Sequence, residues 1–230
     1  MIFVTGDTHG LIDIGKLRRL AMQRRELTRE DFVIVAGDFG GVWCEKTLER
    51  DLAPYEKLPF TVLFVDGNHE NFDLLNSFPM EEWHGGKVHR IRPNIIHLMR
   101  GQIFELAGKT FFTFGGGTSI DKYMRREGLS WWRQEVPSYA EFDEAVTNLE
   151  RVGHRVNYVI THSCDEKSLY TPLLGTVSKS MTVYPDNTML MEFERTVEYD
   201  HWYFGHYHLD GYVTDRKTAL YHDVVQLETE

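Results

Sequence analysis

The chain has 230 residues, 42% of them hydrophobic, and a formal net charge of −10. This is the composition of an ordinary globular protein; the length predicts one domain over residues 1–230, and the acidity argues against an enzyme that works along extended nucleic acid. We also expect a cytoplasmic protein without membrane partners, because no apolar stretch reaches the ~18 residues of a membrane helix, MIFVTGD lacks the layout of a signal peptide, and two cysteines make no disulfide framework.

Strands and helices alternate in the first third of the chain. Residues 2–7, 32–38 and 60–67 are short apolar runs that predict buried strands. Between them, residues 14–27 and 45–57 predict helices. This order indicates a partly parallel sheet that is covered by helices.

The pattern changes near residue 95. Residues 95–116 contain short strand-like runs with tight turns, which predict an antiparallel meander. Ser138 and Glu141 form a capping-box pattern that opens a helix ending near residue 151. The remaining predicted elements are a buried strand at 158–162, a helix at 187–198, the strand-like run HWYFGHYH at 201–208, and terminal strands at 211–215 and 219–228.

Residues 115–138 form the least regular segment, with several glycines, four basic residues and a Trp pair. Long segments without regular structure in compact domains often have a function. We interpret this segment, called the insertion below, either as a structured element beside a site or as an ordinary long loop.

Polar side chains follow five predicted strands at the point where each strand ends. They are Asp7 and His9, Asp38, Asn68 and His69, His162, and His206 and His208. Ligands of α/β proteins bind at the carboxyl ends of strands, so these side chains are expected to converge. On extended backbone, residues i and i+2 point to the same side, which pairs Asp7 with His9 and His206 with His208. The other six histidines lack this context and are interpreted as surface or core residues.

Leaving His69 aside, two Asp, one Asn and four His form a mixed set of hard and borderline donors. Such a set suits Mn²⁺, Fe or Zn²⁺ better than an ion that binds oxygen alone. Seven side chains are too many for one open catalytic metal, but they serve two metals that share a carboxylate and clamp an in-line displacement at phosphorus. Each motif alone is also explained as a turn or a cap; their joint occurrence favours the metal site.

The motifs GDTHG at 6–10, GD at 37–38, GNHE at 67–70, TH at 161–162 and GHYH at 205–208 resemble those of the calcineurin-like metallophosphoesterase family. They occur in the family's order and span nearly the whole chain. The resemblance implies an α/β (α+β) fold, a four-layer α/β/β/α sandwich of two mixed β-sheets flanked by helices.

The resemblance also implies a role for each matching residue. The ligands would form two sets that share a bridging Asp38: Asp7, His9, Asp38 and His208 for one metal, and Asp38, Asn68, His162 and His206 for the other. His69 matches the family's catalytic histidine. Manganese is the first expectation for both ions, with Fe, Zn, Mg and Ni as alternatives.

The sequence departs from one branch of the family. The protein Ser/Thr phosphatases carry an Arg shortly after the second motif and another just before GNHE, but here those stretches are GDFGGVW and LFVDGNHE, without Arg. Four basic residues of the insertion could bind the substrate phosphate instead: Lys122, Arg125, Arg126 and Arg133. Charges of a solvated loop explain them equally well.

Together these features predict a metal-dependent phosphoesterase that cleaves a phosphomonoester or phosphodiester by in-line attack of a metal-bridging hydroxide. Asn68 would also contact the substrate, and His69 would assist the leaving oxygen. The alternatives are a non-catalytic metal-binding scaffold of the same fold and, among enzymes, a nuclease or a nucleotide pyrophosphatase. The sequence leaves the substrate open among a small phosphoester, a nucleotide and a phosphoprotein.

A cysteine phosphatase is a further rival. Cys44 and Arg50 have the C-x5-R spacing of that class, but the residues between them contain two acids and no glycine. A phosphate cradle needs backbone amides that approach closely, so we interpret the spacing as coincidence.

Overall fold

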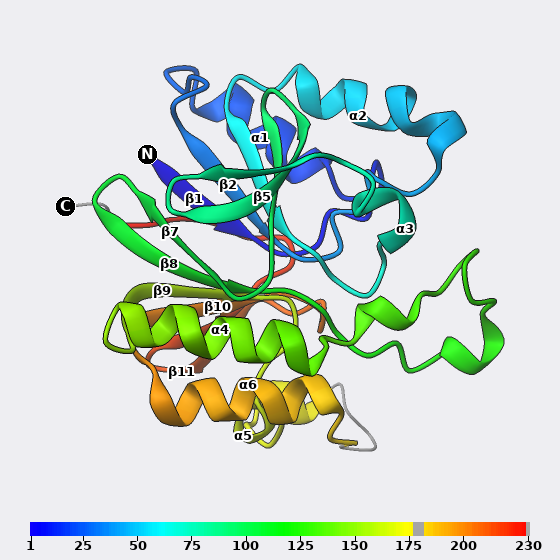
Figure 1. The fold of residues 1–230 in the computed structure, drawn as a ribbon. Helices are drawn as coiled ribbons and strands as arrows, with labels where there is room; N and C mark the ends of the chain where they lie inside the picture. Colours follow the sequence, from blue (N-terminus) through cyan, green and yellow to red (C-terminus); the bar gives the residue numbers. More distant parts are fainter. Residues whose placement is uncertain (177–181, 229–230) are drawn as a thin grey trace.

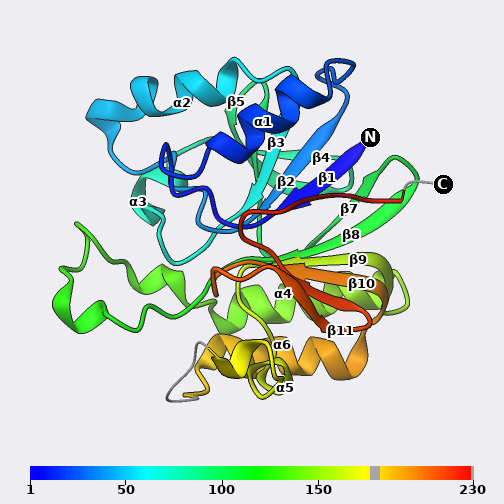
Figure 2. The ribbon, with the colours of Figure 1, turned by 180° about the vertical axis from the view of Figure 1, so that it is seen from behind.

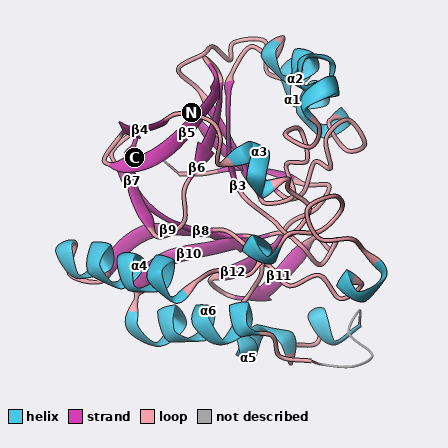
Figure 3. Ribbon diagram, turned by 45° about the vertical axis from the view of Figure 1, so that its right-hand side comes forward, coloured by secondary structure: helices cyan, strands magenta, loops and turns pink. Residues whose placement is uncertain are grey.

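A computed structural model gives the fold, and the structure describes residues 1–176 and 182–228. Two mixed β-sheets pack face to face, and helices cover both outer faces (Figure 1; Figure 3). The predicted four-layer α/β/β/α sandwich is therefore confirmed.

The first sheet contains seven strands within the described residues, in the spatial order β13-β1-β2-β3-β6-β5-β4. Their bounds are β1 Ile2–Thr5, β2 Phe32–Ala36, β3 Thr61–Val65, β4 Met80–Trp83, β5 Gly86–Arg92, β6 Ile95–Leu98 and β13 Val224–Gln226. Strands β1, β2, β3 and β6 are parallel neighbours, whereas β4, β5 and β13 pair antiparallel. The carboxyl ends of β1, β2 and β3 consequently lie at one edge.

The second sheet contains six strands in the same described part of the chain, in the order β11-β12-β10-β9-β8-β7. Their bounds are β7 Gln102–Leu106, β8 Lys109–Phe114, β9 Arg155–Thr161, β10 Glu198–Phe204, β11 Gly211–Thr214 and β12 Lys217–Ala219. Strands β8, β9, β10 and β12 are parallel neighbours, and β7 and β11 add antiparallel edges.

Helices α1 and α2 cover the first sheet, and α4, α5 and α6 cover the second (Figure 1; Figure 2). The α-helices are α1 Gly15–Gln23, α2 Leu48–Glu56, α3 Phe72–Leu75, α4 Tyr139–Arg151, α5 Glu166–Leu169 and α6 Pro185–Thr196. Short 3₁₀ turns span Glu45–Thr47, Lys122–Met124, Arg133–Glu135 and Leu174–Thr176. The capping box of Ser138 and Glu141 is present at the start of α4, as predicted.

Three apolar layers hold the sandwich together. Successive residues of β3 alternate between two of them: Val62 and Phe64 face the helices α1 and α2, and Leu63 and Val65 face the second sheet. The third layer joins the second sheet to its helices, for example through Trp202. A strand buried on both faces has no polar alternation, which explains the continuous apolar run at 60–65.

Two segments that were each predicted to form a single unit, residues 95–116 and residues 219–228, are divided between the two sheets, so both predictions were wrong. Residues 95–116 do not form one meander, since β6 pairs parallel with β3 in the first sheet while β7 and β8 form a hairpin in the second. Likewise, the terminal run at 219–228 is not one strand: β12 ends at Ala219 in the second sheet and β13 crosses to the first.

The insertion projects from the body of the molecule at the edge where the strands end (Figure 1). It contains two 3₁₀ turns and a single isolated bridge between Glu127 and Trp131 among the described residues. No helix of residues 1–176 and 182–228 is long and apolar enough to cross a bilayer.

Candidate metal centre

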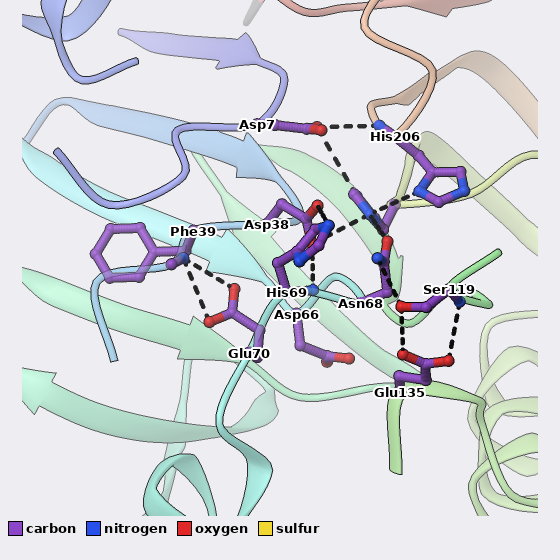
Figure 4. Close-up of polar contacts among 12 residues, drawn as sticks. Asp7, Asp38, Phe39, Asp66, Asn68, His69, Glu70, Ser119, Glu135 and His206 are labelled. Atoms are coloured by element: carbon purple, nitrogen blue, oxygen red, sulfur yellow. Dashed lines mark hydrogen bonds and ion pairs between the residues drawn. The ribbon is translucent and has the colours of Figure 1, made fainter. Parts of the chain in front are cut away.

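Five loops at one edge of the two sheets bring the predicted site residues together, among them Asp7, Asp38, Asn68, His69 and His206, which Figure 4 labels. The loops after β1, β2 and β3 come from the first sheet, and those after β9 and β10 come from the second. The predicted side chains lie in these loops: Asp7, His9, Asp38, Asn68, His69, His162, His206 and His208. Two loop sets from facing sheets thus form one polar cluster in a largely apolar sandwich.

Asp38 lies at the centre of this cluster. Its two carboxylate oxygens face different histidines, with Oδ2 3.5 Å from Nε2 of His9 and Oδ1 3.3 Å from Nε2 of His162. Oδ1 also accepts a hydrogen bond of 2.7 Å from the backbone N–H of His69. The side chain is only 2% exposed, so the protein, and not water, fixes both oxygens.

Asp7 lies beside Asp38 and is also buried. Its Oδ1 accepts a hydrogen bond of 3.0 Å from the backbone N–H of His206. Its Oδ2 is 3.1 Å from Nε2 of His208 and 3.8 Å from Nε2 of His9. Yet Oδ2 has no hydrogen-bond partner of good geometry in the described residues, although water cannot reach it.

His162 and Asn68 form the other side of the cluster. Nε2 of His162 lies 3.0 Å from Oδ1 of Asn68 and 3.1 Å from Nδ1 of His206, while its Nδ1 lies 3.0 Å from the backbone carbonyl of Ala36. A carbonyl can only accept, so Nδ1 of His162 carries a proton and Nε2 is free as a donor atom for a metal in the neutral ring. Burial and the neighbouring His162 together lower the pKa of His206 to about 4.

Glycine is required where His162 approaches β2. Gly37 has φ +92°, and a Cβ there would lie 2.0 Å from Nδ1 of His162. A side chain at this position would displace the imidazole, so the glycine allows the two sheets to present their ligands side by side.

The carboxylates give the cluster a strongly negative potential. Burial alone would lower the pKa of His9, but the hydrogen bonds and charges of the neighbouring carboxylates of Asp38, Asp13 and Asp7 raise this pKa to about 9. Burial alone would also lower the pKa of His162, and Asp38 and Asp7 again raise it. Positive charge is therefore favoured at this point in the protein.

The insertion fixes the amide of Asn68. Nδ2 of Asn68 donates to Oγ of Ser119 at 3.0 Å, and this hydroxyl donates to Oε2 of Glu135 at 2.7 Å (Figure 4). The backbone N–H of Ser119 donates to the other oxygen of the buried Glu135. These contacts turn Oδ1 of Asn68 toward His162, so the insertion is a structured part of the site.

Of the four basic residues predicted in the insertion, Arg125 alone lines the site cavity among the described residues. Its Nη1 lies 3.0 Å from Nδ1 of His69. The others point elsewhere: Lys122 lies over the ring of Trp131, exposed Arg133 pairs with Glu127, and Arg126 is exposed. Sequence alone could not select Arg125 from this set.

A cavity of about 700 Å³ opens at the cluster. Asp38, Asn68 and His69 lie on its wall, together with the beginning of α6 at Asp186 and Asn187. A volume of this size accommodates a small organic ligand. A hollow of about 880 Å³ at the opposite ends of the strands, beside Phe32 and Trp83, contains none of the predicted site residues.

Of the two pairs predicted from extended backbone, Asp7 and His9 do lie together, with Oδ2 of Asp7 3.8 Å from Nε2 of His9, but the pairing of His206 with His208 was wrong. His9, His206 and His208 all have positive φ, of 43°, 67° and 52°. His206 and His208 consequently diverge, His206 toward His162 and His208 toward Asp7. The seven predicted donor side chains nevertheless converge, because the loop conformations, and not an extended backbone, set their directions.

The donor set fits divalent metals. In the part of the chain that the structure describes, two groups have ligand atoms within 4.8 Å of one another: Asp7, His9 and His208, and Asp7, Asp38 and His162. Oδ2 of Asp7 is buried and accepts no well-directed hydrogen bond from the described residues, and together with the high pKa of His9 this indicates a place where a cation would be stabilised. Carboxylate, amide and imidazole donors suit Mn, Fe or Zn.

Comparison with known proteins agrees with this geometry. The family model described as calcineurin-like phosphoesterase matches residues 1–210, and the chain belongs to this family of metal-dependent hydrolases that act on phosphoester bonds. Among solved structures it is similar to the phosphopantetheinyl hydrolase from Mycobacterium tuberculosis, with 16% identity over 96% of this chain and 87% of that chain and a TM-score of 0.41. These values are too low to transfer a substrate. None of the curated proteins matches the chain.

Proposed function

We propose that the chain is a dinuclear metallophosphoesterase that hydrolyses a phosphomonoester or a phosphodiester. In this proposal Asp38 would contribute a ligand to each of two ions, and His69 would be the catalytic histidine. The remaining ligands divide into two sets: Asp7, His9 and His208 on one ion, and Asn68, His162 and His206 on the other.

The observation that carries this proposal is the position of Asp38. One of its oxygens faces His9 at 3.5 Å and the other faces His162 at 3.3 Å, so this carboxylate lies between the two proposed sets of donors. Two metals sharing one carboxylate account for this arrangement, whereas one metal would leave several of the buried donors unused.

Two bound divalent ions would neutralise charge on the phosphate and make a nucleophilic water available near neutral pH. Manganese is our first candidate, and Fe, Zn, Mg and Ni remain alternatives, because the mixed donor set is compatible with each. The residues of the chain then have separate tasks. Asn68, oriented by Ser119, presents its amide oxygen to the centre.

His69 lies at the cavity wall and assists the leaving oxygen. Its Nε2 is 4.0 Å from Oδ2 of Asp38, on the cavity side of the cluster, and its Nδ1 contacts Arg125. A neutral His69 with its proton on Nε2 can donate a hydrogen bond to the oxygen that departs. Among the described residues, Arg125 would be the one basic residue of the insertion close enough to contact the phosphate; Lys122, Arg126 and Arg133 are not proposed for this role.

The cavity favours a small ester over a long polyanion. Arg125 is its one Lys or Arg side chain among the described residues, and Asp121 pairs with it at 2.8 Å. The scarcity of basic side chains in the cavity and the net charge of −10 for the whole chain both argue against a nuclease that moves along nucleic acid.

The test pairs a metal analysis with two esters. The purified chain is assayed for bound metal and for hydrolysis of p-nitrophenyl phosphate and bis-p-nitrophenyl phosphate with added Mn²⁺, beside Asp38→Asn. About two metals per chain and turnover that is lost in Asp38→Asn are expected. Metal without turnover of either ester would favour the non-catalytic scaffold, and absence of metal binding would overturn the proposal.

A further inference from the structure

The C-terminal segment, residues 211–228, lies outside the stretch that matches the family but returns to the metal centre. Its last strand, β13, pairs antiparallel with β1, and the backbone N–H of Leu227 donates to the carbonyl of Ile2 at 2.9 Å (Figure 2). The link between β12 and β13 therefore passes beside the loop that carries Asp7 and His9.

Tyr221 in this link packs on His208. The two rings are stacked, with centroids 4.4 Å apart and planes 11° from parallel. The side chain of His208 is 48% exposed, so solvent alone would let it rotate. The tyrosine ring restricts this rotation and keeps Nε2 of His208 directed at Asp7, 3.1 Å away.

Asp13 holds the second histidine of the same group. Its Oδ2 lies 2.8 Å from Nδ1 of His9 and 3.4 Å from the hydroxyl of Tyr221. A carboxylate only accepts, so the proton of neutral His9 is on Nδ1 and the lone pair of Nε2 faces Asp7 and Asp38. Metal-bound histidines in proteins are commonly held in this way by a carboxylate behind the ring.

Lys16 ties the two segments together. The residue is 4% exposed, and its ammonium donates to the carbonyls of Gly6 at 3.0 Å and Asp7 at 2.6 Å, and also to the carbonyl of Tyr221. The backbone N–H of Tyr221 in turn donates to Oδ1 of Asp210 at 2.7 Å. The link is therefore anchored to the backbone of a candidate ligand.

We propose that Asp13 and Tyr221 are positioning residues for the metal ion held by Asp7, His9 and His208, and that the C-terminal segment completes this one site. The inference rests on the proposed dinuclear function. In the described residues no hydrogen bond or ring contact joins Asp13 or Tyr221 to the ligands of the other ion, Asn68, His162 and His206. Loss of either positioning residue should thus weaken the binding of one ion and leave the binding of the other unchanged.

The experiment titrates the metal-free full chain with Mn²⁺ by calorimetry and records the Mn²⁺ EPR spectrum at two equivalents. Asp13→Ala and Tyr221→Ala are expected to weaken one of the two binding steps about 10- to 100-fold, leave the other unchanged, and lose the spin-coupled two-metal signal. Tyr221→Phe, which keeps the ring, should bind like the parent. Exposed residues of the same segment, Tyr212→Ala and Asp215→Ala, serve as matched controls.

The outcomes separate this inference from the function on which it rests. Two unchanged binding steps in Asp13→Ala and Tyr221→Ala overturn the inference alone. Equal weakening of both steps, or a lower melting temperature of the metal-free variant, also overturns it, because either shows general damage. If Tyr221→Ala does not fold, Asp13→Asn, which keeps the shape of the side chain, decides the question. A parent chain that binds no Mn²⁺ removes the proposed function, and the inference with it.

Discussion

The guanidinium of Arg125 lies 3.0 Å from Nδ1 of His69, and its second terminal nitrogen lies 2.8 Å from Oδ2 of Asp121. A guanidinium only donates hydrogen bonds, so Nδ1 of His69 must accept and the proton of neutral His69 must be on Nε2. Burial lowers the pKa of His69, and although the charge of Asp38 opposes this, the charge of Arg125 lowers it further, so the neutral ring is favoured. Arg125 thus favours the tautomer of His69 that carries its proton on Nε2, from which it can donate a hydrogen bond to a substrate oxygen.

Arg125→Ala should therefore reduce kcat/KM without releasing metal. A hydrogen bond to a charged group contributes about 1.5–3 kcal/mol, which corresponds to a loss of about 10- to 100-fold. Steady-state kinetics beside metal analysis measure both quantities. Arg133→Ala is the control, because this exposed side chain pairs with Glu127 away from the cluster. Parent-like kinetics for Arg125→Ala would remove its proposed role.

His69→Ala should keep its metal content but lose activity according to the leaving group. Assistance to a leaving oxygen is worth ~10²–10⁴ in rate for poor leaving groups and much less for p-nitrophenolate, which departs without help. Turnover of an alkyl phosphate and of p-nitrophenyl phosphate by the same variant gives the comparison. An equal loss on both esters would assign His69 to substrate binding instead.

Gly67→Ala should abolish metal binding, although the change adds one methyl group. A Cβ at Gly67 would lie 2.0 Å from Oδ1 of Asp38 and 2.3 Å from its backbone nitrogen, so the central carboxylate must move. Gly15→Ala is the matched control, since the nearest atom, Nη1 of Arg19, is 3.9 Å away at the start of α1. The control should bind metal normally and be more stable by up to about 1 kcal/mol. Calorimetric metal titration and thermal unfolding of both variants test this contrast.

The sequence was sufficient to predict the strands that precede the candidate ligands. Each is an apolar run that stops at a glycine or a polar residue, and burial on both faces makes such runs visible without any alternation. The capping box at Ser138 was visible for a similar reason, since it depends on residues only three positions apart. The local sequence pattern therefore predicted where the loops begin, and the order of the family's motifs predicted that these loops meet.

Other features depend on tertiary contacts that no local pattern encodes. Which sheet receives β6 or β13 is decided by pairing with distant strands, so the predictions at 95–116 and 219–228 failed. Tyr221 lies outside the motifs, so nothing in the sequence indicated that its ring stacks on that of His208. Asp13 could have been proposed from the sequence as a partner of His9, because it follows His9 by four residues. The single domain and the cytoplasmic location stay predictions.

Asp66 and Arg100 form a buried ion pair directly behind the loop of Asn68, and this pair should dominate the acid stability of the metal-free protein. The side chains are 2% and 5% exposed, and Nε and Nη2 of Arg100 donate to Oδ2 of Asp66 at 2.9 and 2.5 Å. Burial alone would raise the pKa of Asp66, but Arg100 and His97 lower it well below its usual range. The ionised carboxylate therefore stabilises the folded state.

Arg100→Met should lower the free energy of unfolding by about 3–5 kcal/mol at pH 7, because it leaves a buried carboxylate without its cation. Asp66 has a depressed folded-state pKa, so its stabilisation is complete above the unfolded pKa of about 3.9 and is lost as the pH falls below that value. Without Arg100, burial raises the pKa of this carboxyl in the folded variant, so the difference between parent and variant should begin to narrow above about pH 4 and narrow further below it. Urea unfolding in EDTA at several pH values measures it, and the double variant Asp66→Asn/Arg100→Met should recover part of the loss. A difference that stays constant with pH would show that Arg100 acts through packing, not through its charge.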